Sequence, residues 1–294
     1  MTHLKQNLCA VLAAFIWGTA FVAQSASADI VPPFAFNGSR SIIAAAFLVI
    51  VVFALNGKNT VSKFNQSKKN IIIGGICCGL ALFAATNLQQ LGFVFGTTAG
   101  KSGFITALYI VLVPIFGLLF KKKVPFTVWI SVALSAAGLY MLCVNETLTV
   151  QKGDFFVILC SVMFAVHILV VDNFVSKADG VMLSMVQFLT VGILSFAVSF
   201  IFEDLKWADI VSCAFPILYV GIMSSGIAYT LQIVAQKDSN PTVISLLLSL
   251  ESVFAVVSGA IILKETMVLK EYIGCVVMLS AVILAQIPVR KNVL

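Results

Sequence analysis

The sequence predicts an all-α integral membrane protein with ten transmembrane helices, arranged as two inverted five-helix repeats. Three observations lead to this fold class: the apolar composition, the spacing of the apolar runs, and the placement of the charges. Of the 294 residues, 61% are hydrophobic and only 10% are charged, against about a quarter in soluble domains. So few charges cannot cover a water-facing surface of this size. Most soluble folds, a disordered chain and a nucleic-acid-binding protein are therefore excluded.

The chain divides into ten apolar runs of the length that crosses a bilayer, which is about 20 residues. Cutting at charges, prolines and glycine clusters gives the candidate spans 8–26, 34–55, 70–93, 100–120, 126–144, 154–172, 180–202, 210–235, 241–263 and 271–289. Pro125 and Pro241 lie near first helical turns, where proline is tolerated. The run 8–26 could pass for a signal peptide, but nine further runs make it a retained first helix. The connections are too short to hold a soluble catalytic domain.

The basic residues orient the bundle. With a cytoplasmic N-terminus, twelve Lys and Arg residues fall inside: Lys5, Lys58, Lys63, Lys68, Lys69, Lys121, Lys122, Lys123, Lys177, Lys237, Arg290 and Lys291. Five fall outside: Lys101, Lys152, Lys206, Lys264 and Lys270. Because cytoplasmic loops are enriched in basic residues, this asymmetry predicts that both termini are cytoplasmic. It also supports the number ten, since a miscounted span would scramble the alternation.

A weak internal repeat divides the chain into halves 1–145 and 146–294. At an offset of 143 residues, matching pairs are Leu88 with Leu231, Gln89 with Gln232, Ser102 with Ser245, Val113 with Val256, and Lys121 with Lys264. Coincidence within an apolar composition remains an alternative explanation for these matches. Five spans per half would give the halves opposite orientations, which is the architecture of many secondary transporters.

These motifs together resemble the bacterial EamA-type members of the drug/metabolite transporter superfamily, over residues 8 to 289. The resemblance rests on the runs Ala14–Phe21, Thr97–Ile105, Gly226–Tyr229, Ser249–Ala255 and Leu263–Glu265, together with Arg40 and Val113-Pro114. Two departures are Ser252, where such members usually carry proline, and Lys121–Lys123, where an acidic residue is common. The missing proline bears on how span nine bends. The resemblance implies a central cavity lined mainly by spans 1, 3, 4, 6, 8 and 9.

Four residues within or near the apolar spans carry or can carry a charge. Because charge in hydrocarbon is costly, each of them is expected to have a functional or structural role. Glu251, near the middle of span nine, is the first candidate for binding a substrate amine or a proton; a helix-bridging hydrogen bond is the alternative. His167 titrates in a range suited to proton exchange, or it packs as a neutral group. Arg40 and Lys101 either anchor helices or contact an anion.

Neutral polar and aromatic side chains complete the predicted cavity. Asn87 and Gln90 are three residues apart and share a helix face, whereas Gln89 points elsewhere. Tyr229 and Gln232 have the same spacing. We expect these four residues to line the cavity, with Trp17 and Tyr109 adding aromatic surface, and plain packing as the alternative. Pro114 in span four is a candidate hinge because it removes one helical hydrogen bond. Gly75 and Gly79 would let helices approach closely.

The predicted function is secondary transport by alternating access, with no cofactor and no metal. The seven cysteines show no metal-ligand spacing and indicate small hydrophobes. His-Glu-x-x-His, Gly-x-Ser-x-Gly and Walker A motifs are missing, so an intramembrane enzyme or ATPase is disfavoured. The expected solute is a small amino acid-like or other amphipathic or cationic metabolite, moved outward with or without proton coupling. A facilitative exchanger and a lipid or lipid-linked-sugar flippase remain alternatives, and the oligomeric state, monomer or homodimer, stays open.

Overall fold

The structure is a computed structural model that describes all residues except 1–2, 98, 120–123, 144–150, 263–267 and 287–294. Every regular element among the described residues is helical, which confirms the all-α class. The first half contains α1 (His3–Ser27), α2 (Pro33–Asn56), η1 (Gly57–Asn59), α3 (Thr60–Val94), α4 (Ala99–Ala107), α5 (Tyr109–Leu119) and α6 (Phe126–Cys143). The second contains α7 (Lys152–Phe174), α8 (Gly180–Phe202), α9 (Trp207–Ser212), α10 (Ala214–Tyr219), η2 (Val220–Ala228), α11 (Tyr229–Gln236), α12 (Pro241–Leu248), α13 (Glu251–Ile262) and α14 (Leu269–Gln286).

About eight to ten of the described helical segments are apolar enough to cross a membrane. Eight meet a criterion of length and hydropathy, one of them the 62-residue segment Pro33–Val94, and Phe126–Met141 is a shorter apolar helix. That long segment contains both α2 and α3, because the chain turns at Gly57, whose φ of +51° suits glycine. The predicted ends at 120, 144, 263 and 287–289, with Lys121–Lys123 and Leu263–Glu265, lie outside the described residues.

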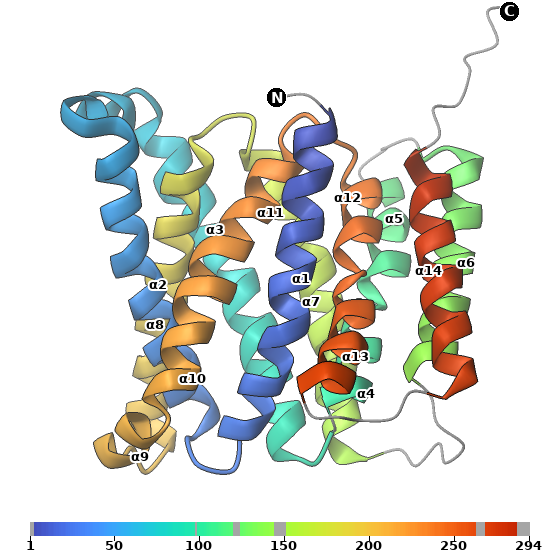
Figure 1. The fold of residues 1–294 in the computed structure, drawn as a ribbon. Helices are drawn as coiled ribbons and strands as arrows, with labels where there is room; N and C mark the ends of the chain where they lie inside the picture. Colours follow the sequence, from blue (N-terminus) through green and yellow to red (C-terminus); the bar gives the residue numbers. More distant parts are fainter. Residues whose placement is uncertain (1–2, 98, 120–123, 144–150, 263–267, 287–294) are drawn as a thin grey trace, which may run out of the picture.

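The helices stand side by side as one bundle, with the connections at its two ends (Figure 1). The start of α1 and the end of α14 lie at the same end of the bundle, and Asn7 Nδ2 donates to Gln286 Oε1 at 2.9 Å. Helix α2 packs against α8, α3 against α7 and α8, α1 against α13 and α11, and α6 against α14. Helix α1 therefore lies centrally, in contact with the later spans of the second half.

The distribution of side chains is that of a protein surrounded by lipid. Large apolar side chains are exposed, including Ile50 at 68%, Phe202 at 78% and Ile261 at 73%. Polar side chains such as Asn37, Gln187 and Ser195 are fully buried inside the bundle. This distribution follows from the solvent, because a bilayer does not hydrogen-bond polar groups and they must find partners inside the protein.

Acidic and amide side chains cap the helix ends at the connections. Asp179 accepts hydrogen bonds from the backbone nitrogens at the start of α8, and Asn240 does the same for Thr242 in α12. Glu203, which follows α8, accepts from Phe34 N and Ala35 N of α2, both at 2.9 Å. A carboxylate at these unpaired N–H groups interacts favourably with the helix dipole. Of these caps, only that of Glu203 joins the end of α8 to the start of α2.

Glycines on α3 set its close contact with α8. A Cβ atom at Gly75 would lie 2.5 Å from Val186 Cβ, and one at Gly79 would lie 2.6 Å from Thr190 Cβ and 2.9 Å from the carbonyl oxygen of Gln187. Backbone cannot move aside as a flexible side chain does. The predicted small-residue pattern therefore permits the observed approach of the two helices.

A Gly79→Ala variant is expected to lose about 1–3 kcal/mol of stability, as other overpacked sites do, and to unfold at lower temperature in detergent. Gly103→Ala is the matched control, because a Cβ there would meet nothing nearer than Ser252 Oγ at 4.0 Å. A helical alanine is favoured over glycine by about 1 kcal/mol, so the control should be neutral or stabilised. Equal melting temperatures of the two variants would contradict this account of the α3–α8 contact.

Candidate functional site

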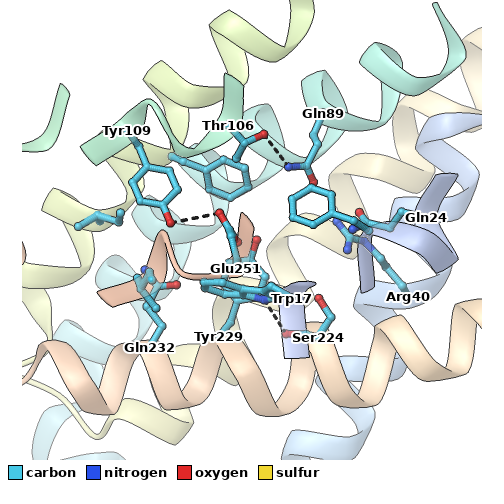
Figure 2. A pocket seen from close by; sticks show the side chains of 14 residues that line it. Trp17, Gln24, Arg40, Gln89, Thr106, Tyr109, Ser224, Tyr229, Gln232 and Glu251 are labelled. Atoms are coloured by element: carbon cyan, nitrogen blue, oxygen red, sulfur yellow. Dashed lines mark hydrogen bonds between the residues drawn. The ribbon is translucent and has the colours of Figure 1, made fainter. Parts of the chain in front are cut away.

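A cavity lies near the centre of the bundle and has polar and aromatic walls (Figure 2). The space open to the centre of a water-sized sphere is about 30 Å³, within about 460 Å³ of total space between side chains that includes space open to solvent. Its lining residues are Trp17, Phe21, Gln24, Arg40, Gln89, Thr106, Tyr109, Phe164, Ile168, Ser224, Tyr229, Gln232, Leu248 and Glu251. They come from α1, α2, α3, α4, α5, α7, η2, α11, α12 and α13. Both halves of the chain therefore contribute to the wall.

Three of the lining residues begin a helix directly after an irregularity. Tyr109 begins α5 after the break at Leu108, Glu251 begins α13 after the break at Ser249 and Leu250, and Tyr229 begins α11 after the π-helical segment η2. Interrupted membrane helices expose backbone groups where they line a cavity, and they mark binding sites in transporters. The irregularities thus lie where the cavity is formed.

Glu251 and Tyr109 form a direct contact across the cavity wall. Tyr109 Oη donates to Glu251 Oε1 at 3.2 Å, and Tyr109 is 3% exposed and Glu251 4%. In the described part of the chain, no Lys, Arg or His nitrogen lies within 4 Å of this carboxylate. A phenol supplies only one of the hydrogen bonds that a carboxylate can accept. Glu251 therefore retains capacity for a solute group or a proton.

Arg40 lies at another part of the same cavity, beside Gln24 and away from Tyr109 (Figure 2). Its Nε donates to Asn37 Oδ1 at 2.7 Å, and its guanidinium lies 5.8 Å from the centre of the Phe36 ring. Both partners belong to its own helix, α2. No acidic oxygen of the described residues lies within 4 Å of it.

A hydrogen-bond network of neutral amides, on the side of Arg40 away from the cavity, positions its side chain. Asn37 Nδ2 donates to Thr86 O at 3.1 Å and to Asn87 Oδ1 at 3.0 Å. Asn87 Nδ2 in turn donates to Ser195 Oγ at 3.1 Å. The network links α2, α3 and α8 and uses no anion, so it orients the guanidinium without neutralising its charge.

Aromatic rings line the space beside Glu251. The ring centres of Trp17 and Tyr229 are 4.7 Å apart at an angle of 60°, and Trp17 Nε1 donates to the carbonyl of Ser224 at 3.4 Å. His167 lies behind Tyr229, with ring centres 6.0 Å apart, and does not line the cavity. Its Nε2 lies 3.1 Å from Gln187 Oε1. Contact of His167 with a solute is therefore indirect, through Tyr229.

The structure brings together Trp17, Arg40, Tyr109, Tyr229, Gln232 and Glu251 as lining residues. Asn87 and Gln90, which we expected at the cavity, do not line it. Asn87 belongs to the network behind Arg40, and Gln90 Nε2 donates to the carbonyl of Gln24 at 3.3 Å. Their shared helix face packs against neighbouring helices instead of the cavity.

Gln89 and Gln24 are lining residues that sequence reasoning missed. Gln89 Nε2 donates to Thr106 Oγ1 at 3.1 Å, so this amide faces span four rather than away from the centre. The alignment of Gln89 with Gln232 in the repeat was a signal for Gln89, because Gln232 was already expected at the cavity. Gln24 lies near the end of α1, and no pattern in the sequence marked it.

The model of the EamA-like transporter family matches residues 4–144 and again residues 151–286. The chain belongs to this family. The protein is therefore a multi-pass membrane protein of the drug/metabolite transporter superfamily, which confirms the resemblance found in the sequence.

Two relatives of this chain carry the name uncharacterized transporter. One, from Archaeoglobus fulgidus, is 28% identical over 288 residues, which cover 98% of this chain and 87% of the relative. The other, from Synechocystis, is 22% identical and the match covers 93% of this chain and 87% of the relative. A crystal structure of a protein superposes with a TM-score of 0.80 at 17% identity over 97% of both chains. That likeness shows the fold alone.

Two features of the structure bear on the predicted helix bends. Span nine is interrupted between α12 and α13 although Ser252 stands where proline was expected, and Ser252 Oγ donates to the carbonyl of Gly103 in α4 at 3.3 Å. Span four is interrupted at Leu108, whereas Pro114 lies inside the continuous helix α5. The break in span four therefore lies before Pro114, which is not itself the point of interruption.

Lys101, in the first turn of α4, forms an ion pair with Asp154 at the start of α7. Asp154 also accepts from Thr97 Oγ1 at 3.0 Å and from Gln151 N at 2.8 Å. Lys101 does not line the cavity. The structure thus favours its structural role, and Asp154 is the partner that the sequence analysis missed.

A double-mutant cycle with Lys101→Met and Asp154→Asn is expected to give a coupling energy of about 1.5 kcal/mol or more, typical of a hydrogen bond between charged groups. The carboxylate is only 4% exposed, so water screens it weakly. The exposed pair Lys206–Asp204, 3.5 Å apart, is the control, and its cycle should give less than about 1 kcal/mol. Thermal unfolding in detergent measures both. Similar coupling energies for the two pairs would contradict a buried ion pair that stabilises the contact between α4 and α7.

Proposed function

We propose that this chain is a secondary transporter that carries a small amphipathic metabolite through the central cavity by alternating access. The observation that carries this proposal is the joint lining of one cavity by Glu251, Arg40 and neutral amides from both halves of the chain. Buried polar side chains in a membrane bundle are costly and typically mark a solute path. Glu251 is the proposed site for a protonated amine or for a coupled proton.

The two halves, 1–145 and 146–294, are proposed to be inverted repeats. The double match of the family model supports this division. Spans four and nine are interrupted at corresponding places, since Tyr109 and Glu251 each begin a helix after the break and are 142 residues apart. Interrupted helices in equivalent positions of two repeats are typical of transporter substrate sites.

Alternating access requires a contact at each end of the bundle that opens in turn. At one end, Asp154 at the start of α7 binds Lys101 and Thr97 near the connection from α3 to α4. At the other end, Gln6 in α1 donates to the carbonyl of Lys237, in the connection from α11 to α12. In each case the first helix of one half contacts the link between the third and fourth spans of the other half. These are the proposed gates.

Two alternatives within transport are a facilitative exchanger and a flippase for lipids or lipid-linked sugars. Proton coupling through Glu251 would distinguish the proposed mechanism from the exchanger. If His167 takes part in that coupling, it does so through Tyr229, which lies between it and the cavity. The proposed direction is export across the plasma membrane of a prokaryote. Both termini are proposed to be cytoplasmic, because basic residues are in excess on that side.

The test begins with a thermal-shift screen of the purified protein against amino acids, polyamines, nucleosides and cationic drugs. The most stabilising solute is then followed by uptake into proteoliposomes. We expect saturable uptake, with the solute recovered chemically unchanged. Uptake no greater than in protein-free liposomes would refute the proposal, and a chemically altered solute would indicate an intramembrane enzyme instead.

A matched pair of variants assigns uptake to the cavity. Leu248→Trp places a larger side chain in the lining, where Leu248 is 1% exposed, and is expected to reduce uptake at least about ten-fold. Leu189→Trp is the control, because Leu189 on α8 is 44% exposed and does not line the cavity. Size-exclusion chromatography checks that both variants fold. Wild-type uptake by a folded Leu248→Trp variant would place the solute path elsewhere.

A further inference from the structure

We propose that an anionic phospholipid binds in a hollow at a bend in α3, with its phosphate against Lys68 and Lys69 and an acyl chain along the helix beyond them. The hollow is lined by Asn65, Gln66, Ser67, Lys68, Lys69, Asn70, Ile72 and Ile73. It shares no lining residue with the central cavity. The proposal therefore concerns a second site and does not depend on the identity of the transported solute.

The bend divides α3 into a polar segment and a membrane-spanning segment. Ser67 has φ of −125° and ψ of 18°, which are not helical values. Before the bend, residues 60–66 are held to the bundle by Phe64, which packs against a buried apolar cluster contributed by α2, α3 and α8. The connection from α2 to α3 lies at the same end of the bundle as the start of α1 (Figure 1). The hollow is therefore fixed in position at the end where the spanning part of α3 begins.

The surroundings of the hollow are strongly basic. The connection carries Lys58 and Lys63 in addition to Lys68 and Lys69, and all four side chains are exposed. The sequence from residue 30 to residue 145 contains no acidic residue. Within the described residues, neither Lys68 nor Lys69 lies within 4 Å of a carboxylate. Lysines clustered directly outside a membrane helix attract anionic headgroups, so the charge of this hollow complements a phospholipid phosphate.

Beyond the lysines, one face of α3 is apolar and exposed. Ile73 lies four residues after Lys69, and Ile76 and Leu80 follow at helical spacing on the same face. Ile73, Ile76 and Leu80 are 44%, 42% and 51% exposed. At 1.5 Å per residue, the distance along the helix from Lys69 to Leu80 is about 16 Å. This is about half of a hydrocarbon core of about 30 Å, so the apolar face matches an acyl chain in one leaflet.

A lipid occupies both parts of this site, whereas a free anion occupies only one. Inorganic phosphate would contact the lysines and leave the apolar face of α3 uncovered. A zwitterionic lipid such as phosphatidylcholine would bring a quaternary ammonium close to two lysines, and like charges repel. Phosphatidylglycerol has no cationic group and keeps its net negative charge. The exposed amides of Asn65 and Gln66 are further hydrogen-bond donors for its phosphate or glycerol oxygens.

Native mass spectrometry of the purified full-length protein in detergent tests the proposal, with dioleoyl phosphatidylglycerol and dioleoyl phosphatidylcholine as the probes. We expect the first bound phosphatidylglycerol to bind about ten-fold or more tightly than phosphatidylcholine, because each lysine near an anionic surface contributes about five-fold in affinity. Equal affinities for the two lipids would overturn the proposal. Complete displacement of phosphatidylglycerol by glycerol 3-phosphate would also overturn it, because the site would then bind a free anion.

Paired substitutions assign the lipid preference to the hollow. Lys68→Gln with Lys69→Gln should lower the preference for phosphatidylglycerol to less than about three-fold, and Lys68→Arg with Lys69→Arg should retain it. The matched control is Lys5→Gln with Lys237→Gln, which removes the same charge from exposed positions in α1 and in the connection from α11 to α12. The control should keep the wild-type preference.

The control separates a site from general attraction to a basic surface. An equal loss of preference in the control and in the Lys68→Gln, Lys69→Gln pair would overturn the proposal, as would an undiminished preference in that pair. Size-exclusion chromatography checks that each variant is folded. If the glutamine pair does not fold, Lys69→Gln alone should lower the preference by about five-fold, and an unchanged preference in this single variant would reject the site.

Discussion

Replacing Glu251 by glutamine is expected to lower solute uptake by about 10- to 100-fold and to remove its dependence on pH. Glutamine keeps nearly the same shape and accepts the hydrogen bond from Tyr109 Oη, which is 3.2 Å from the carboxylate. It cannot bind a proton or pair with a cation. A hydrogen bond between charged groups is worth about 1.5–3 kcal/mol, which corresponds to the stated loss. Uptake into proteoliposomes at pH 6, 7 and 8 measures the effect.

Tyr109→Phe is the matched control for this experiment. It removes the neutral partner of Glu251 and retains the carboxyl group, so uptake should fall by less than about ten-fold, in line with about 1 kcal/mol for one neutral hydrogen bond, and its pH dependence should remain. A Glu251→Gln variant that transports at the wild-type rate at every pH would exclude Glu251 as the coupling group.

Replacing Asn37 by leucine is expected to destabilise the protein by about 3 kcal/mol, the upper range for leaving buried partners unsatisfied. Asn37 is fully buried and is the only hydrogen-bond acceptor of Arg40 among the described residues. Leucine is similar in size but removes that acceptor and both donors to α3. The guanidinium would then lose its fixed orientation. Thermal unfolding in detergent gives the stability change.

Ser39→Ala provides the control within the same helix. Ser39 is also buried, but its hydroxyl donates only to the carbonyl of Ala35, at 2.8 Å within α2. Its removal should cost less than about 1 kcal/mol, because interhelical and local hydrogen bonds in membranes average well below the charged case. If Asn37→Leu and Ser39→Ala are equally stable, the amide network does not hold Arg40.

The helices were predictable from the sequence because each apolar run must form all its backbone hydrogen bonds internally. The start of α2 at Pro33 and the start of α12 at Pro241 follow from proline at the first turn. The interruptions were not predictable in the same way. Span four breaks at Leu108, a good helix former, while Pro114 lies within α5.

Residue types at the site were predictable, but their orientations were only partly so. Glu251 and Arg40 were identifiable because ionisable groups are rare in apolar runs. For Asn87, Gln89 and Gln90, helical spacing predicts which side chains share a helix face. It does not predict which face points toward the cavity. When lipid and packing faces are both apolar, hydrophobic periodicity does not indicate which face points to the centre. The choice of Gln89 for the cavity and Asn87 for the network depends on which helices flank α3.

By itself, therefore, the sequence determined that this protein lies in a membrane, where its apolar helices run, and which few polar residues need an explanation. Each of these follows from local composition and the length of a helix that crosses a bilayer. Only the tertiary structure decided that Tyr109 meets Glu251, that Asn37 holds Arg40, and that both charges share one cavity. Those contacts join residues as far as 142 positions apart, and they depend on packing between helices, which local composition does not encode.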